Sequence, residues 1–159
     1  MTPSILRTPW QPGPDGDRTV GRVLVSVTEF TSVTQWRALG VAVNGMRLRR
    51  SWPGTGGAVG MWLWVDPAHR RSGSVSVWST EQALTDFVRR PDHVGTVRAF
   101  RAHGTMRATS WTDARFDAGT AWRTARALLT GATPWPAPTP RTGPAPRTEP
   151  TPRTGKAPR

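Results

Sequence analysis

The chain has 159 residues, no cysteine, no tyrosine and a formal net charge of +12 at pH 7. This length suits one domain around a single hydrophobic core, and the lack of cysteine excludes disulfides, thiolate nucleophiles and zinc sites built on cysteine. The most apolar run, Val59 to Val65, is too short to span a bilayer. We therefore expect a cytoplasmic protein that does not enter a membrane.

The positive charge makes nucleic acid a candidate partner, because clustered cations bind phosphates by releasing counterions. Part of that charge lies in the C-terminal stretch, where Pro-Arg-Thr recurs every six residues from Pro140. This stretch has too little apolar surface to offset the entropy of ordering. We therefore predict that residues 132–159 form a disordered tail, which offers nucleic acid or acidic proteins only a secondary means of contact.

The first half of the chain predicts a flexible arm, a strand and a helix. Residues 1–18 lack the uninterrupted apolar core of a signal peptide and are expected to form the arm. From Thr19 to Phe30 valines alternate with other residues, so both faces of a strand are usable. From Ser32 to about Leu48 the apolar period becomes helical, although two glycines make this helix depend on tertiary packing.

The second half predicts three more strands and two further helical segments. A turn-rich connection leads to a strand over 58–66, and a hairpin-length loop leads to the next strand over 74–78. Ser79 with Gln82 forms a capping-box signature for a helix that Pro91 interrupts, and Asp92 can cap its second part. Gly104 ends it, and residues 105–111 alternate as a strand again.

These elements follow the order βαββαβ, which is the ferredoxin-like unit. We therefore predict an α+β domain over residues 19–131 with a four-stranded antiparallel sheet. A further helix over 117–129 is expected to pack on the sheet edge or on a partner subunit.

His93 is the main candidate for a catalytic residue. It begins the second helical segment, whose Val97 and Phe100 lie on the same side at helical spacing, so its ring should border the apolar, sheet-facing side. A base that removes a phenolic or carbon-bound proton, or an iron ligand, would need that position. The alternative is a capping or hydrogen-bonded histidine at a helix start.

Other polar motifs offer less. His69 lies in a polar hairpin loop and His103 at a helix end, so we predict no metal site made by protein side chains alone. The glycines from Gly54 to Gly60 precede a strand and do not follow the spacing of a phosphate-binding loop, which favours a simple turn. Alternatively, their backbone amides together with Arg49 and Arg50 receive a carboxylate.

Aromatic residues are the candidates for a substrate pocket, because offset stacking suits flat aromatic or polyene ligands. Large aromatics also fill cores, and we expect at least half of the tryptophans to do so. The pocket candidates lie on predicted strands and helices: Trp36, Trp62, Trp64, Trp78, Phe87 and Trp111.

The run WLWVDPAHRRSGSVSVW, the glycines around Thr55, the strand-ending Trp78 and a helix with Phe87 and His93 together resemble a known family. The family is the dimeric α/β-barrel monooxygenases, and the resemblance covers roughly residues 19–111. Within it the chain is most similar to spheroidene-monooxygenase-like proteins and more loosely to antibiotic-biosynthesis monooxygenases. The resemblance implies a homodimer whose two sheets face each other, with a ligand pocket between each sheet and its own helices.

The resemblance also implies an activity. Some members oxygenate polyketide-like aromatics without a cofactor, and others bind or degrade haem. In haem-degrading relatives a helix histidine binds iron, while a tryptophan and a strand asparagine shape the pocket. Trp78, Phe87 and His93 are the counterparts here, but the first strand offers Ser26 and Thr28 and no asparagine.

The function we expect is a monooxygenase for a hydrophobic aromatic or polyene metabolite, either free of cofactor or with haem. In the haem version Arg49 and Arg50 receive a propionate and His93 binds the iron. The alternatives are a non-catalytic barrel that binds a ligand or partner, and a basic module whose arginine-rich tail contacts nucleic acid or acidic proteins.

Overall fold

The computed structural model describes residues 4–17 and 21–137, and for residues 35–39 and 42 it describes the backbone alone. The described residues form an α+β domain. In chain order the strands and helices are β1 (Leu6–Arg7), β2 (Gln11–Pro12), β3 (Val23–Ser32), α1 (Gln35–Ser51), β4 (Ala58–Asp66), β5 (Arg71–Trp78), α2 (Glu81–Arg89), α3 (Pro91–Arg101), β6 (Gly104–Asp113) and α4 (Ala118–Thr130). Short 3₁₀ turns cover Trp52–Gly54 and Pro67–His69.

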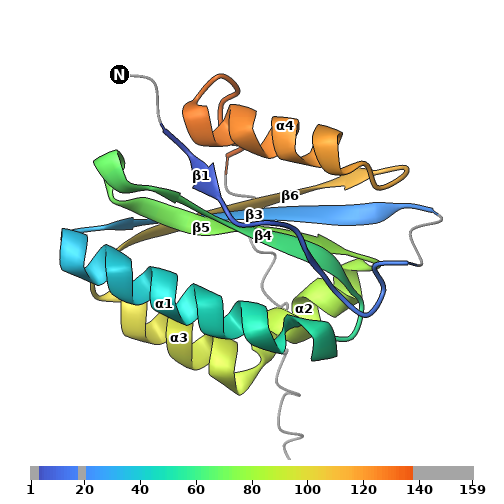
Figure 1. Cartoon of the computed structure of the whole chain (residues 1–159), viewed down its shortest axis with the longest axis horizontal. Helices are drawn as coiled ribbons and strands as arrows, with labels where there is room; N and C mark the ends of the chain where they lie inside the picture. The colour runs from blue at the N-terminus through green and yellow to red at the C-terminus, as the bar shows by residue number, and fades with distance from the viewer. Residues whose placement is uncertain (1–3, 18–20, 138–159) are drawn as a thin grey trace, which may run out of the picture.

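The four long strands form an antiparallel sheet in the order β4-β5-β3-β6 (Figure 1). Helix α1 joins β3 to β4, and α2 with α3 joins β5 to β6. Together these elements make the βαββαβ connection of the ferredoxin-like fold, as the sequence predicts. The strand over Ala58–Asp66 has the predicted bounds, and the break between α2 and α3 falls at the predicted Arg90-Pro91 step.

The N-terminal segment is a correction, because residues expected to form a loose arm are paired with the sheet. Strand β1 pairs with β4 at Leu6 and Val65, and β2 pairs with the same strand at Gln11 and Met61. Between them, the ring of Trp10 lies 4.3 Å from that of Trp62. The sequence pattern missed this pairing because two-residue strands show no alternation.

Two local details also differ from the expectation. Strand β5 begins at Arg71 and not at Ser74, since the preceding turn is short and closes at Arg70, whose φ is 55°. Helix α2 is capped by Thr80, whose side chain accepts a hydrogen bond from the backbone N–H of Ala83, whereas the Ser79 hydroxyl donates to the carbonyl of Gly57.

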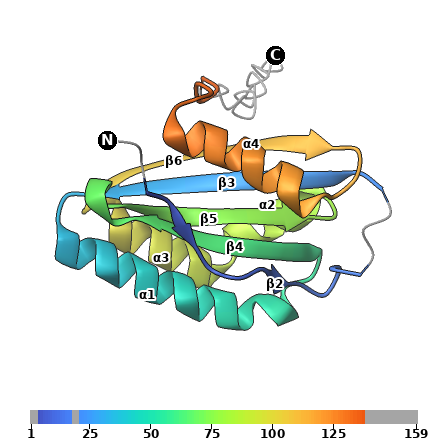
Figure 2. The ribbon, with the colours of Figure 1, turned by 45° about the horizontal axis from the view of Figure 1, so that its top comes forward.

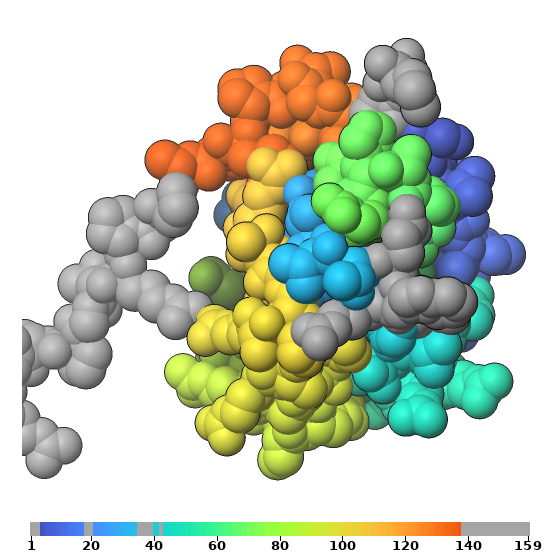
Figure 3. All heavy atoms as spheres, turned by 90° about the vertical axis from the view of Figure 1, so that its left-hand side faces the viewer, coloured from blue at the N-terminus to red at the C-terminus, as the bar shows by residue number. Residues whose placement is uncertain are grey.

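Helix α4 lies across one face of the sheet, while α1, α2 and α3 cover the other face (Figures 1 and 2). An end view shows the same three layers (Figure 3). The α4 face is a closed core of buried residues from both layers: Val23, Val25, Val27, Val59, Trp62, Trp64, Val75, Val77, Ala121, Ala125, Leu128 and Leu129. We expected α4 on the sheet edge or on a partner; it packs on the sheet face because its small and branched side chains fit between the valines.

This packing bears on the predicted homodimer. Two sheets can face each other only through the face that α4 covers, and Val25, Val27 and Val75 on that face have no exposed surface in the single chain. A dimer with facing sheets would therefore require α4 to leave this position. The homodimer stays a prediction.

The C-terminal end of α4 is fixed by a buried charge network. Arg71 donates to Asp66 at 2.6 Å, to Glu29 at 3.2 Å and to the carbonyl oxygen of Leu129 at 2.9 Å. Arg107 adds a second ion pair to Glu29 at 2.9 Å. Burial alone would raise the pKa of Asp66, but hydrogen bonds and charges from Arg71 and His69 outweigh it, and the pKa lies below its usual range.

The predicted tail lies mostly outside the described residues, which end at 137. In the part of the chain that is described, no helix is long and apolar enough to cross a membrane.

Candidate functional site

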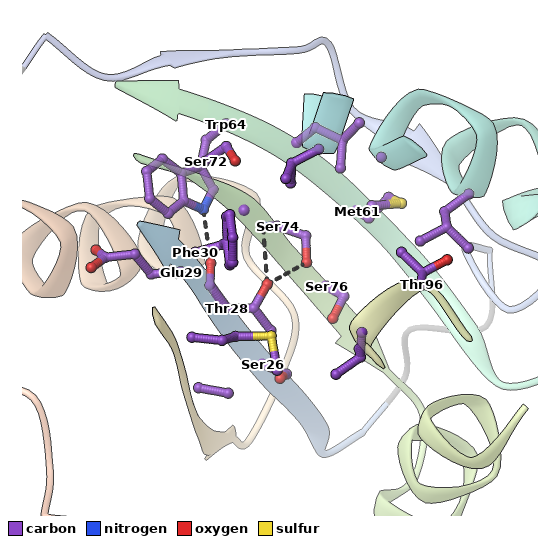
Figure 4. Close-up of a pocket in the computed structure, with 18 of the residues that line it drawn as sticks. Ser26, Thr28, Glu29, Phe30, Met61, Trp64, Ser72, Ser74, Ser76 and Thr96 are labelled. Atoms are coloured by element: carbon purple, nitrogen blue, oxygen red, sulfur yellow. Dashed lines mark hydrogen bonds between the residues drawn. The ribbon is translucent and has the colours of Figure 1, made fainter. Parts of the chain in front are cut away.

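A cavity of about 700 Å³ lies between the sheet and helices α1, α2 and α3. Three rows of side chains cross the four strands and form its floor (Figure 4). From β4 to β6 the rows are Met61, Ser76, Ser26 and Ser110; then Leu63, Ser74, Thr28 and Ala108; then Val65, Ser72, Phe30 and Met106. The two central strands carry small hydroxyl residues in most of these places, which leaves the middle of the floor hollow.

The hydroxyl groups of the floor are held by neighbours in the sheet. The Thr28 and Ser74 hydroxyl oxygens are 2.9 Å apart, and Thr28 also accepts from the Ser74 backbone N–H at 3.2 Å. Ser76 accepts from the indole N–H of Trp78 at 2.9 Å (Figure 4 shows the Thr28 and Ser74 contacts). The floor is therefore polar in composition, with the Thr28, Ser74 and Ser76 hydroxyl groups hydrogen-bonded, and it is flanked by apolar walls.

The helices supply those apolar walls. Val41 and Met46 come from α1, Leu84 and Phe87 from α2, and Val97 with Phe100 from α3. Met46, Val88 and Met106 line the cavity and are also exposed, which places them at its mouth. An apolar cavity of this size with a few polar groups is typical of small-molecule sites.

His93 lies on this cavity in the first turn of α3, as the sequence predicts. Its Nδ1 lies 3.2 Å from the carbonyl oxygen of Val88. Since a carbonyl can only accept, Nδ1 carries the proton and Nε2 holds the free lone pair. Burial lowers the pKa of His93, with a smaller contribution from the Arg90 cation, and this outweighs the Val88 hydrogen bond and the Asp92 charge. The imidazole is therefore neutral near pH 7 and able to accept a proton.

An aromatic cluster lies next to His93. The ring of Phe87 is 4.9 Å from His93, 5.2 Å from Trp78 and 5.5 Å from Trp52. The indole N–H of Trp52 is buried without a hydrogen-bond partner among the described residues, and so is the Ser72 hydroxyl. Both residues line the cavity.

Two of the predicted site residues, His93 and Phe87, meet at the cavity, and Trp64 borders it from the α4 core to which it belongs. Trp78 does not line it but supports its floor from the buried cluster, which also includes Met61. Trp62 and Trp111 belong instead to the core under α4, where Trp62 lies between Trp10 and Trp122. The side chain of Trp36 is outside the described residues.

Arg49 and Arg50 are not brought to the cavity. Arg49 donates to the carbonyl oxygen of Pro9 at 3.3 Å, and Arg50 is exposed at the end of α1. The glycine-rich segment between them and β4 is a turn, with Gly57 at a φ of 75° and packed against Ala83. The described residues contain no cluster of three or more histidine and carboxylate side chains able to hold a metal ion.

The sequence analysis missed the hydroxyl floor. Ser26, Thr28, Ser74 and Ser76 alternate with buried valines in two strands that turn out to be neighbours. That shared alternation was a usable signal, because a row of small polar residues on one face of two paired strands marks a face that is not filled by the core.

No family model and no curated protein matches the chain. Several solved structures are similar to it. SnoaB from Streptomyces nogalater, a cofactor-independent oxygenase, is 19% identical over 60% of this chain and 96% of that chain, with a TM-score of 0.47. A ferredoxin-fold protein related to antibiotic biosynthesis monooxygenases, from Listeria monocytogenes, is 14% identical over 58% of this chain and 57% of that chain, with a TM-score of 0.48.

LmHde, a haem-degrading enzyme from Listeria monocytogenes, is 14% identical over 53% of this chain and 59% of that chain, with a TM-score of 0.43. At these identities the similarity is one of fold. The ferredoxin-like architecture itself is established by the strand order of this chain.

Proposed function

We propose that the chain is a monooxygenase that holds an apolar aromatic or polyene molecule in the cavity and uses His93 as a base. The observation that carries the proposal is the state of His93: a neutral ring on an apolar cavity, with Nδ1 held by a backbone carbonyl and Nε2 left as acceptor. The proposal agrees with the activity implied by the sequence resemblance.

In this reaction Nε2 of His93 accepts the proton of an acidic phenol or carbon acid. Removal of the proton leaves an electron-rich anion, and the apolar walls keep water from it. The anion transfers electrons to O₂; for a methylene group that becomes a carbonyl, the substrate supplies all four electrons, one oxygen atom enters it and the other leaves as water. The fixed tautomer gives His93 one orientation for the transfer.

An electron-rich tricyclic anthrone such as dithranol tests the proposal. Wild-type protein should raise O₂ consumption and anthraquinone formation above the spontaneous rate. His93→Asn should lower the protein-dependent rate about 10²- to 10⁴-fold, the usual contribution of a positioned base. His69→Asn is the matched control, since His69 binds Asp66 outside the cavity and should keep the rate. Equal rates in wild type and His93→Asn would contradict the proposal.

Binding can be separated from chemistry with Gly45→Phe. Gly45 lines the cavity from α1, and a Cβ atom there would lie 3.5 Å from the methyl groups of Leu63, an ordinary contact distance. The larger side chain should fill part of the cavity without straining the helix. The neutral fluorophore N-phenyl-1-naphthylamine should bind wild type and lose at least about tenfold in affinity in this variant, as expected for an excluded ligand.

Haem is a second candidate, and one observation favours it. A histidine that ligates a metal usually donates its other ring N–H to a carbonyl or carboxylate, as Nδ1 of His93 does to Val88. The residues fit this role: His93 would hold the iron and the apolar walls would hold the macrocycle, which would supply O₂ activation when bound. Arg49 and Arg50 lie outside the cavity and would not reach its propionates.

Titration with hemin distinguishes the two versions. A saturable Soret shift that His93→Ala abolishes would support the haem version. No saturable shift, or one that His93→Ala leaves intact, would contradict it and leave the cofactor-free version. Ligand binding without O₂ consumption, with or without haem, would instead indicate a non-catalytic binding protein.

A further inference from the structure

The charged residues that line the cavity differ in the partners with which their charged groups interact. In the described part of the chain the ionisable residues that line it are Arg7, Glu29, His93 and Arg101. The Arg7 guanidinium lies over the rings of Trp62 and Trp122, at 5.2 and 4.5 Å. Glu29 is neutralised by its ion pairs to Arg71 and Arg107.

Arg101 is different: it lines the cavity with an exposed guanidinium that has no hydrogen-bond or ion-pair partner among the described residues. No carboxylate that lines the cavity is free to neutralise it, since Glu29 is already paired on both oxygens. The Ser72 hydroxyl, also without a partner, belongs to the same end of the floor: Ser72 pairs with Phe30, whose ring is 6.1 Å from that of Phe100. This end of the cavity therefore carries the Arg101 cation at its surface, and the unpaired Ser72 hydroxyl is buried in the floor.

The spacing between Arg101 and His93 along α3 defines the length of a ligand that contacts both residues. Both residues lie on α3 and line the same cavity, eight positions apart. With a rise of 1.5 Å per residue their backbones are separated by about 12 Å along the helix. Between them, Thr96, Val97 and Phe100 form a mainly apolar wall.

We propose that the cavity takes an elongated apolar anion, with its anionic group on Arg101 and its other end at His93. The inference rests on the proposed function, because it names the substrate class for the same cavity and the same base. Arg101 is a specificity-determining residue in this view: it favours a carboxylate or a sulfonate, because either group offers two oxygens to the two parallel N–H donors of a guanidinium. Anchoring at one end positions the reacting end about 10–12 Å away, within reach of Nε2.

Two fluorescent probes of nearly the same shape test the proposal. 1-Anilinonaphthalene-8-sulfonate carries an anionic group, and N-phenyl-1-naphthylamine is the same ring system without it. Arg101→Gln should weaken the anionic probe about tenfold, as expected from the loss of a charge-assisted hydrogen bond. It should change the affinity for the neutral probe less than about twofold, and Arg101→Lys should retain part of the preference for the anion.

Arg98→Gln is the matched control. Arg98 lies on the same helix, is exposed and does not line the cavity. At 150 mM salt it should change both affinities less than about twofold, since an exposed charge is screened beyond about 8 Å. In wild type the His93 ring resonances should shift when the anionic probe binds.

Three results would overturn the inference. If Arg98→Gln weakens the anionic probe as much as Arg101→Gln, the probe senses only the basic surface. If Arg101→Gln weakens both probes equally, Arg101 is a structural residue. If neither probe loses affinity, the cation has no role in recognition. Failure of the proposed function is seen separately, as an anthrone-dependent O₂ consumption that His93→Asn does not lower.

Discussion

The two faces of the sheet are built from the same strands and have opposite properties. Toward α4 the strands present valines and tryptophans, which are buried and in contact with Ala121, Ala125 and the leucines of α4. Toward the other helices the same strands present serines, a threonine and a few large apolar residues around a cavity. Strand β5 shows the difference most clearly, since Val75 and Val77 are fully buried under α4 while Ser74 and Ser76 face the hollow.

The comparison shows that the two alternating sets of residues in a strand have different roles: one set packs the core and the other lines the cavity. Close packing makes the α4 face sensitive to changes of a single methyl group. Hydroxyl residues on the cavity face leave volume empty and supply hydrogen-bonding groups, at the expense of packing energy. Substitutions on the α4 face should therefore change stability, and substitutions on the cavity face should change binding.

The largest effect is expected at Arg71, in the charge network that closes the α4 face. Arg71→Leu leaves the carboxylates of Glu29 and Asp66, 5% and 0% exposed, without their shared cation. Removing one partner of a buried pair costs about 3–5 kcal/mol of unfolding free energy. Urea denaturation would measure the loss. A change below about 1 kcal/mol would mean that the network contributes nothing to the docking of α4.

A smaller and sharper contrast comes from two neighbours on β5. Val75→Ala opens a void in the closed core and should lower the unfolding free energy by about 2 kcal/mol, while the neutral probe binds as before. Ser74→Ala removes only the hydrogen bond to Thr28 and should cost about 0.5–1 kcal/mol. It should change probe affinity more than Val75→Ala does. Equal effects of both substitutions on stability and on binding would contradict the claim that the two faces of the sheet have different roles.

The smallest effect concerns the pH dependence that His93 adds on the cavity face. An unfolded histidine takes up a proton near pH 6.5, and the folded ring does so only at lower pH, because its pKa is lowered. Between these two pKa values the unfolded chain binds more protons, so stability falls as the pH falls through this window and is complete above it. NMR titration should show His93 titrating below pH 6.5, and His93→Asn should remove this part of the acid sensitivity. A pKa at or above 6.5 would contradict the account.

The fold was predictable because its signals are local. Alternation in β4, the proline at position 91 and the helical period of α4 each set an element without knowledge of its neighbours. The order βαββαβ then fixes the sheet. The path of the N-terminal segment was not predictable, since Trp10 is held by contacts with Trp62 and Phe116, far along the chain.

The site was predictable only in part, for the same reason. Phe87 and His93 were found because each lies with other apolar residues on one face of its own helical segment, Phe87 on α2 and His93 on α3. The sequence could not show which tryptophans line the cavity and which belong to the core. A strand pattern shows which residues share a face, but it does not show which face α4 will cover. Arg101 and Ser72 carry no sequence signal of their own; Arg101 stands out by its place on the cavity, and Ser72 by a buried hydroxyl without a partner among the described residues.

The break at Arg90-Pro91 places His93 between two helix ends. The carbonyl oxygen of Val88 lies in the last turn of α2, where the chain no longer supplies an intrahelical donor, and the His93 ring provides one at 3.2 Å. His93 also lies in the first turn of α3, where the helix dipole is positive and disfavours an imidazolium. A continuous helix would provide neither condition. The helix break at Pro91 therefore determines which ring nitrogen of His93 is protonated, and it helps to keep the ring uncharged.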